Sequence, residues 1–200
     1  MKQTTCVCAY VRMCACAFVL TCVCAYVRLC TTFITERQTK KHTTMKKIIN
    51  PWTKIPGYCC PGCCPTNERG LRLEFYEDGD DIVSYWQPDP TLQSWRNTLH
   101  GGIHCMMLDE VAGWVVFHKL KTVAVTSRMD TKYLKPITID GGVVEMRARL
   151  TRQVRQVSYI DAELIQGGEV CSKAQVVYFC YSRERSLAEY NFDGCDTETI

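Results

Sequence analysis

The sequence predicts an α+β fold in which an antiparallel sheet of five to six strands wraps around one long central helix. Residues 71–182 contain six segments with the alternating pattern of strands and one longer segment with the period of a helix. Asp-Gly and Gly-Gly turns join neighbouring strands, which is typical of antiparallel pairing. A single helix covers a sheet of this size only if the sheet curls around it.

The first two strands are predicted as a hairpin. Residues 71–77 (LRLEFYE) alternate apolar and polar side chains, DGDD makes a tight turn, and residues 82–87 (IVSYWQ) form the second strand. Residues 51–70 are rich in Pro, Gly and Cys and are expected to be an ordered loop. Residues 88–99 carry two closely spaced prolines, which excludes the interior of a sheet.

The central helix is predicted to begin near Gly101 and to run to His118. Its apolar side chains recur at three- and four-residue steps: Ile103, Met106, Met107, Val111, Trp114 and Val115. Gly113 lies inside this helix, where glycine costs about 1 kcal/mol relative to alanine. We therefore expect Gly113 to serve close packing.

Four more strands are predicted after the helix, at residues 122–136, 142–154, 158–166 and 169–182. The last two are joined by Gly167 and Gly168, a hairpin turn signal. Residues 183–200 are polar and are expected to form a peripheral tail. The main domain is thus predicted over residues 45–182.

Residues 1–44 form a cysteine-rich leader with an internal repeat. TCVCAYVRMC at 5–14 and TCVCAYVRLC at 21–30 agree in nine of ten letters. The longest uncharged stretch, 13–27, is shorter than the roughly 20 residues that span a membrane. The simplest interpretation is a duplicated stretch read upstream of a start at Met45, disordered or outside the native domain. An export or membrane signal and a metal site remain open alternatives.

The charge of the chain is unevenly distributed. Residues 1–44 have a net charge of +5, whereas residues 45–200 have a net charge of −2. The basic character therefore comes from the leader. Since the main domain lacks clustered positive charge, we expect no nucleic-acid partner and no membrane, and a cytoplasmic protein.

Three stretches of the main domain resemble one known family. LHGGIHCMMLDEVAGW at 99–114 resembles the hotdog-fold thioesterases of the phenylacetate-pathway (PaaI-like) type, in which His-Gly-Gly opens the central helix and an acidic residue follows nine positions after the His. Those positions are His100 and Asp109 here. The pattern C-x-x-C-x-x-x-N-x-x-G-L-x-L-x-F at 60–75 and TSRMDTKYLKP at 126–136 are also similar to members of this family.

The resemblance implies hydrolysis of acyl-CoA thioesters to free acid and coenzyme A. Asp109 would act as general base or nucleophile, with the adjacent Glu110 as the next candidate. Gly101 and Gly102 suit an oxyanion hole, because a helix N-terminus offers unpaired N–H groups. His100 would shape the turn by hydrogen bonding. Thr126 falls near the position where relatives carry a Ser or Thr that orients the water.

Substrate contacts are expected around the same helix. Relatives often carry an Asn six residues before the His; that position is Ser94 here, and Asn97 is the other candidate for this contact. Met106 is expected to line the acyl pocket together with neighbouring aromatic and apolar side chains. Arg128 is a candidate for the coenzyme A phosphates, as are Lys132, Lys135 and Arg147.

No resident metal or cofactor is expected; coenzyme A enters as part of the substrate. Two other interpretations of the cysteines and histidines are weaker. Cys59, Cys60, Cys63 and Cys64 could form a zinc knuckle, but a C-x-x-C pair usually needs a second pair elsewhere, and reduced structural thiols are favoured. Cys105 beside His104 suggests a Cys/His nucleophile, but no other feature supports an activated thiolate. His104 and His118 are expected to be surface or core residues.

Two other functions compete with the thioesterase. A non-catalytic acyl-CoA-binding hotdog module, acting as a sensor or partner subunit, is the main alternative; Asp109 argues against it, since a sensor needs no acid there. A hydratase or dehydratase would need a different motif at the helix start. A homodimer or homotetramer is expected, because the sheet has an open edge that a second copy can pair.

Overall fold

The computed structural model describes residues 45–200, so the expectations for residues 1–44 lie outside the described part. The described residues form one compact unit. Its main strands are β2 (Phe75–Asp78), β3 (Asp81–Trp86), β6 (Ala124–Tyr133), β7 (Val144–Val154), β8 (Val157–Gln166) and β9 (Glu169–Cys180). Short elements precede the central helix: a 3-10 turn η1 (Pro51–Lys54), another, η2 (Pro90–Leu92), and the small pair β4 (Gln93–Trp95) and β5 (Thr98–Leu99).

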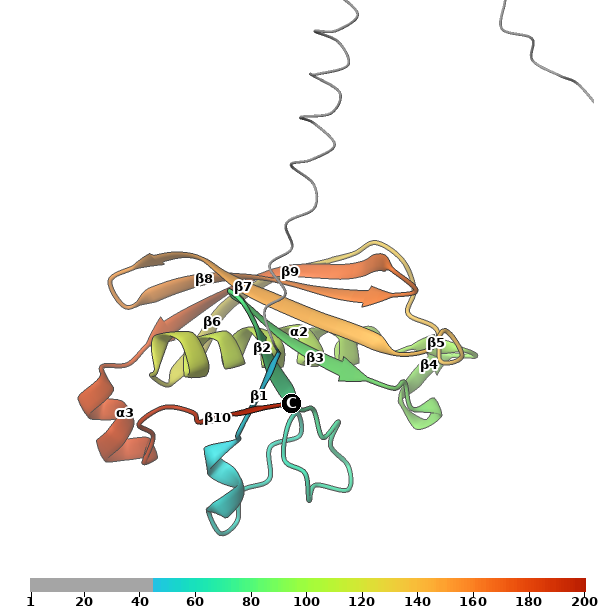
Figure 1. Cartoon of the computed structure of the whole chain (residues 1–200). Helices are drawn as coiled ribbons and strands as arrows, with labels where there is room; N and C mark the ends of the chain where they lie inside the picture. The colour runs from blue at the N-terminus through green and yellow to red at the C-terminus, as the bar shows by residue number, and fades with distance from the viewer. Residues whose placement is uncertain (1–44) are drawn as a thin grey trace, which may run out of the picture. The chain divides into compact units, whose positions relative to one another are not determined.

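The central helix α2 (Gly101–Val115) lies against one face of the sheet and continues into a π-helical turn, η3 (Val116–Leu120) (Figure 1). The predicted α+β architecture, one long helix on a large antiparallel sheet, is therefore confirmed. Gly113 is the exception to the expected packing. A Cβ on Gly113 would lie 3.6 Å from the Tyr178 hydroxyl and 3.8 Å from Phe117, which is ordinary van der Waals contact.

The sheet has eight strands in the order β10-β1-β2-β3-β7-β8-β9-β6, more than the five to six expected. All six predicted strands are present. The additions are β1 (Lys46–Ile48) and β10 (Thr197–Thr199), which pair with each other at one edge. Strands of three residues show too little alternation to be recognised from sequence. The opposite edge is β6, which among the described residues pairs only with β9.

The predicted strand 71–77 is shorter than its alternation suggests. Leu71, Leu73 and Phe75 are buried on alternate positions, but only Phe75 lies in β2. The backbone N–H groups of Leu71 and Leu73 instead donate to the carbonyls of Pro61 and Gly62, at 2.8 and 2.9 Å. The segment therefore pairs with the cysteine-rich loop before it reaches the sheet.

The C-terminal segment packs into the domain instead of forming a peripheral tail. Helix α3 (Arg183–Tyr190) carries the buried Ser186, whose hydroxyl is 2.7 Å from that of Thr122. Phe192 is 1% exposed and stacks on Trp52 with ring centroids 4.9 Å apart. A single buried aromatic in a polar stretch gives no periodic signal, which is why composition alone suggested a peripheral segment.

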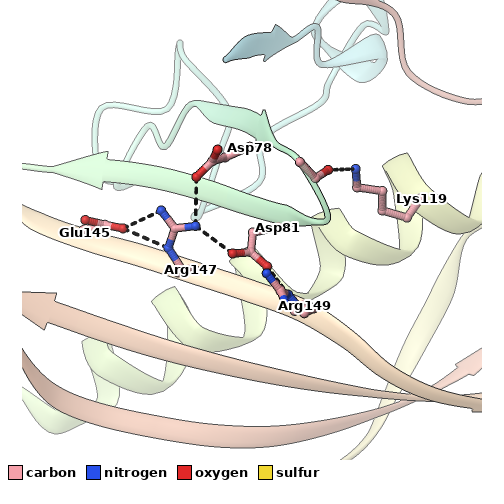
Figure 2. A network of polar contacts seen from close by, with 7 residues as sticks. Asp78, Asp81, Lys119, Glu145, Arg147 and Arg149 are labelled. Carbon is pink, nitrogen blue, oxygen red and sulfur yellow. Dashed lines mark hydrogen bonds and ion pairs between the residues drawn. The ribbon is translucent and has the colours of Figure 1, made fainter. Parts of the chain in front are cut away.

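Arg147 joins the β2–β3 hairpin to β7 (Figure 2). Its guanidinium is 2.9 Å from Asp78 and 2.7 Å from Asp81, and it also pairs with Glu145 on its own strand at 3.0 Å. Asp81 is buried and also pairs with Arg149. In the part of the chain that the structure describes, no helix is long and apolar enough to cross a membrane.

Candidate active site

Asp109 lies in the third turn of α2 and is half-buried. Its Oδ1 accepts a hydrogen bond from the hydroxyl of Thr126, at 2.9 Å, on the neighbouring strand β6. The structure thus brings together two candidates that are 17 residues apart in sequence. Both described hydrogen bonds to this carboxylate reach Oδ1, so Oδ2 is left without a partner among residues 45–200.

Tyr178 is the second donor to Asp109, a contact that the sequence pattern does not predict. Its hydroxyl is 2.8 Å from Asp109 Oδ1 and 2.7 Å from the Asp109 backbone carbonyl. Tyr178 is 4% exposed, and burial together with the nearby carboxylate raises the pKa of its phenol well above the ordinary value, which keeps it a donor. It pairs directly with Thr126 in the β6–β9 register. A phenol among the apolar residues of 174–180 that alternate towards the core was the available signal.

The start of α2 is capped by His100. Its backbone is extended, and its Nδ1 accepts a hydrogen bond from the Gly102 N–H at 2.9 Å. A Cβ on Gly102 would lie 3.0 Å from that same Nδ1, so glycine at this position leaves room for the imidazole. The Ile103 N–H donates to the His100 carbonyl at 2.9 Å. Of the first three N–H groups, only that of Gly101 has no acceptor within the described residues.

A cavity of about 350 Å³ opens at this helix start. Ser94 and Gly101 both line it, together with the buried His104. Its other walls come mainly from the end of β6 and the turn that follows: Tyr133, Leu134, Lys135 and Pro136. The free N–H of Gly101 therefore belongs to a residue that borders a space large enough for a small acyl group.

The remaining substrate-binding candidates lie elsewhere. Asn97 donates from Nδ2 to Asp140 at 2.8 Å and holds a turn, with its backbone at a positive φ of 61°. Met106 is partly buried and packs against the core. Arg128 is exposed and pairs with Asp130 at 3.0 Å. Arg147, also considered for phosphate, is occupied by the carboxylates described above.

Glu110 faces away from the Thr126–Tyr178 pair. Its Oε1 accepts a hydrogen bond from the Trp114 indole at 3.2 Å, and each of its oxygens is 3.7 Å from the Cys60 thiol. Burial and then Cys60 raise the pKa of Glu110 to about 7. Since α-helical neighbours point about 100° apart, Glu110 and Asp109 serve different surroundings.

The histidines and Cys105 do not form a nucleophile pair in the described structure. His104 Nδ1 is 2.7 Å from the hydroxyl of Ser172, and burial lowers the His104 pKa to about 4. The Cys105 thiol instead lies 2.9 Å from the Tyr133 hydroxyl. His118 is half-buried and lies 3.2 Å from Glu77. His104 and His118 are thus packed residues.

Part of the chain matches a known protein family. The family model of the thioesterase superfamily matches residues 96–173, which include α2, Asp109 and Thr126. No curated protein shows significant sequence similarity to the chain.

Three solved structures illustrate the shared fold. RHA08564, a thioesterase superfamily protein, is 15% identical with a TM-score of 0.57; the match covers 80% of this chain and 78% of that one. A phenylacetic acid degradation-related protein of Ralstonia eutropha JMP134 is 22% identical with a TM-score of 0.50, covering 56% and 86%. The smu.793 protein of Streptococcus mutans UA159, solved bound to acetyl CoA, is 17% identical with a TM-score of 0.50, covering 55% and 89%. The hotdog fold is thus confirmed, and residues 96–173 resemble the thioesterase superfamily.

Proposed function

We propose that this protein hydrolyses acyl-CoA thioesters, with Asp109 as the general base. The observation that carries the proposal is the anchored carboxylate: Thr126 and Tyr178 both donate to Oδ1, which leaves Oδ2 to accept a proton. A solvated surface Asp needs no such pair of donors. The match to the thioesterase superfamily supports the reaction class.

In the proposed reaction, Asp109 Oδ2 takes a proton from water as the water oxygen attacks the thioester carbon. The carbonyl oxygen becomes an oxyanion, which accepts a hydrogen bond from the Gly101 N–H at the positive end of the α2 dipole. The C–S bond then breaks, and the coenzyme A thiolate leaves and takes up a proton. Thr126 and Tyr178 act as positioning residues because they touch the carboxylate and not the reacting atoms.

The site requires two copies of the chain. Gly101 and Asp109 are eight residues apart on one helix, which separates them by roughly 12 Å along its axis. One thioester carbon cannot lie about 3 Å from both groups of the same helix. Strand β6 has an open edge, and Val125 and Tyr133 on it are about half exposed. Pairing of two β6 edges would bring Gly101 of one copy near Asp109 of the other.

The cations that would bind the coenzyme A phosphates lie beside the same cavity. Lys135 lines it and pairs with the exposed Glu169, an ion pair that a phosphate can replace. Lys132 and Arg128 lie exposed on β6. The acetyl CoA bound to the smu.793 protein supports this class of ligand for the fold.

The decisive experiment measures thiol release from a panel of aromatic and aliphatic acyl-CoAs. Asp109→Asn is expected to lower kcat by roughly 10²–10⁴-fold. Asp161→Asn, the same change at an exposed position of β8, is the matched control and should keep full activity. Binding without turnover by the parent would favour the non-catalytic module instead. Equal turnover by the parent and Asp109→Asn would rule out Asp109 as the base.

A second variant tests the oxyanion donor. Proline is favoured at the first position of a helix, and His100 already has the extended backbone that a following proline requires. Gly101→Pro therefore removes the N–H with little strain, and we expect kcat to fall roughly 10²–10³-fold. Mixed dimers of Gly101→Pro and Asp109→Asn should regain about a quarter of parental activity, because half the dimers carry one intact composite site. No recovery in verified mixed dimers would contradict the shared site.

A further inference from the structure

Two cysteines and a carboxylate converge on the side of α2 that faces the cysteine-rich loop. The ligand atoms of Cys60, Cys63 and Glu110 all lie within 4.8 Å of one another. The Cys60 sulfur is equally distant, at 3.7 Å, from both Glu110 oxygens. These residues come from separate segments, 50 positions apart. Within residues 45–200, this is the one cluster of at least three such side chains.

The loop presents its sulfurs as metal ligands are usually presented. Cys60-Pro61-Gly62-Cys63 makes a tight bend in which the Gly62 N–H donates to the Cys60 sulfur at 3.3 Å. The hydroxyl of Tyr58 lies 3.0 Å from the Cys63 sulfur. A donor such as the Gly62 N–H stabilises a thiolate and fixes its direction, which is the role of the outer shell in a metal site.

Gly62 makes room for the third group. A Cβ on Gly62 would lie 2.3 Å from Glu110 Oε2 and 2.4 Å from its Cδ. Only glycine therefore allows the carboxylate to approach the two sulfurs. The Trp114 indole holds the same carboxylate from the other side, at 3.2 Å. No Lys or Arg of the described residues forms an ion pair with Glu110, so a half-buried acid lies beside two thiols without a cation of the protein's own.

We propose that Cys60, Cys63 and Glu110 bind one Zn²⁺ ion, with water as the fourth ligand. Zinc takes thiolate and carboxylate together in tetrahedral sites, where ligand atoms are roughly 3.5 Å apart. The separations here need only a small contraction to meet that geometry. Zinc is preferred to magnesium or calcium because two of the ligands are soft sulfurs.

The other two loop cysteines do not belong to the site. Cys59 is exposed, and Cys64 is buried with its sulfur directed to the Tyr58 carbonyl at 3.3 Å. A single C-x-x-C pair supplies only two ligands, and the helix adds a third, Glu110. The ion would therefore join residues 60–63 to α2 and stabilise the fold, apart from the Asp109 chemistry.

The test is the zinc content of the full-length protein, purified under reducing conditions without chelator and measured by inductively coupled plasma mass spectrometry. We expect Cys60→Ser, Cys63→Ser and Glu110→Gln each to hold one equivalent less than the parent. Cys59→Ser, the same change at an exposed position of the same loop, should hold the parental amount. Because every variant keeps residues 1–44, any zinc held by the cysteines of that segment is the same in all of them and does not affect these differences.

Cobalt substitution keeps the test valid if a serine variant folds poorly. Thiolate-to-cobalt charge-transfer absorbance should appear in the parent above the level of a Cys60→Ser/Cys63→Ser double variant. Glu110→Cys adds a third thiolate, so its charge-transfer absorbance above the double variant should be about 1.5 times that of the parent. Chelation should lower the Tm of the parent and leave that of the double variant unchanged.

Three results would overturn the proposal. Equal zinc in the parent and in folded Cys60→Ser would place the metal elsewhere. Full zinc in Glu110→Gln would remove the carboxylate from the site. Metal-free protein with a Cys60–Cys63 disulfide, detected by thiol counting and mass, would make the pair a redox couple instead.

Discussion

The Tyr178 hydroxyl on β9 lies within hydrogen-bond distance of two atoms of Asp109, the backbone carbonyl at 2.7 Å and Oδ1 at 2.8 Å. Tyr178 therefore contacts both the helix backbone and the side chain it carries. Because the phenol is buried at the sheet end of this contact, the position of the carboxylate is coupled to the packing of α2 on β9. A substitution that changes the packing of the phenol should therefore displace the Asp109 carboxylate.

Tyr178→Phe removes this donor and keeps the ring. We expect kcat to fall roughly 10- to 100-fold with KM little changed, because a positioning residue affects the chemical step. Stability should fall by about 1–2 kcal/mol, since two acceptors lose a buried partner. Steady-state kinetics and urea unfolding measure both effects.

Tyr85→Phe is the matched control, since Tyr85 is 43% exposed on β3. It should leave kcat and stability unchanged. Thr126→Val removes the other donor to Oδ1, and Tyr178→Phe/Thr126→Val should show a coupling energy with the single variants. Strictly additive losses would mean that the two donors do not orient the same carboxylate.

Gly113→Ala should stabilise the protein. The structure leaves ordinary contact distances around an added Cβ, and alanine favours a helix interior over glycine by about 0.8–1 kcal/mol. That gain corresponds to a rise in Tm of about 2–4 °C for a domain of this size. Thermal unfolding followed by circular dichroism measures the change.

Gly62→Ala provides the opposite case for the same substitution. There the added Cβ would overlap the Glu110 carboxylate, so Tm should fall. A lower Tm for both variants would show that α2 is packed more tightly at Gly113 than these contact distances indicate.

The two glycines also show where sequence reasoning succeeds and where it stops. The period of α2 and the alternation of six strands are local patterns, so they could be recognised directly. The spacing from His100 to Asp109 is also local, because both lie on one helix. Whether a mid-helix glycine is crowded depends on Tyr178, which is 65 residues further along the chain. Such information is absent from the helix sequence.

The contacts that complete the Asp109 site and the proposed zinc site both join residues that are far apart in the sequence. Tyr178 reaches Asp109 across 69 residues through the β6–β9 register, and Cys60 reaches Glu110 across 50 through a loop. Strands β1 and β10 were missed for a different reason. Each has only three residues, and their pairing joins the two ends of the domain. Pattern methods need several residues of alternation, whereas pairing needs only a suitable neighbour.

Arg147→Met should destabilise the domain by about 2–3 kcal/mol, because it leaves the buried Asp81 with only Arg149 as partner. Asp78 and Glu145 would lose their cation as well (Figure 2). Lys173→Met is the control, since Lys173 is an exposed cation on β9 without an ion pair among the described residues. Urea unfolding of both variants measures the difference. If Arg147→Met lowered the free energy of unfolding no more than Lys173→Met does, the ion pairs of Arg147 would contribute nothing to stability.

Titration of His104 should lower the stability of the folded protein as pH falls from 6.5 towards 4. Burial, and then the nearby His100, lower the folded-state pKa of His104 to about 4, from an ordinary value of 6.5. Between these two values the unfolded chain binds more protons than the folded one, so stability falls as pH falls from 6.5 towards 4. The effect should be on the order of 2–3 kcal/mol.

The groups around His104 include the Ser172 hydroxyl, the Tyr133 ring at 5.6 Å, His100, and Lys135 in the same cavity, and none of these is an anion that would offset the effect. The measurement is the free energy of unfolding between pH 4 and 7 for the parent and for His104→Asn. Asparagine can keep a hydrogen bond to Ser172 but does not titrate. The parent should therefore lose stability more steeply than the variant over this range, and parallel curves would show that His104 is protonated equally in the folded and unfolded states.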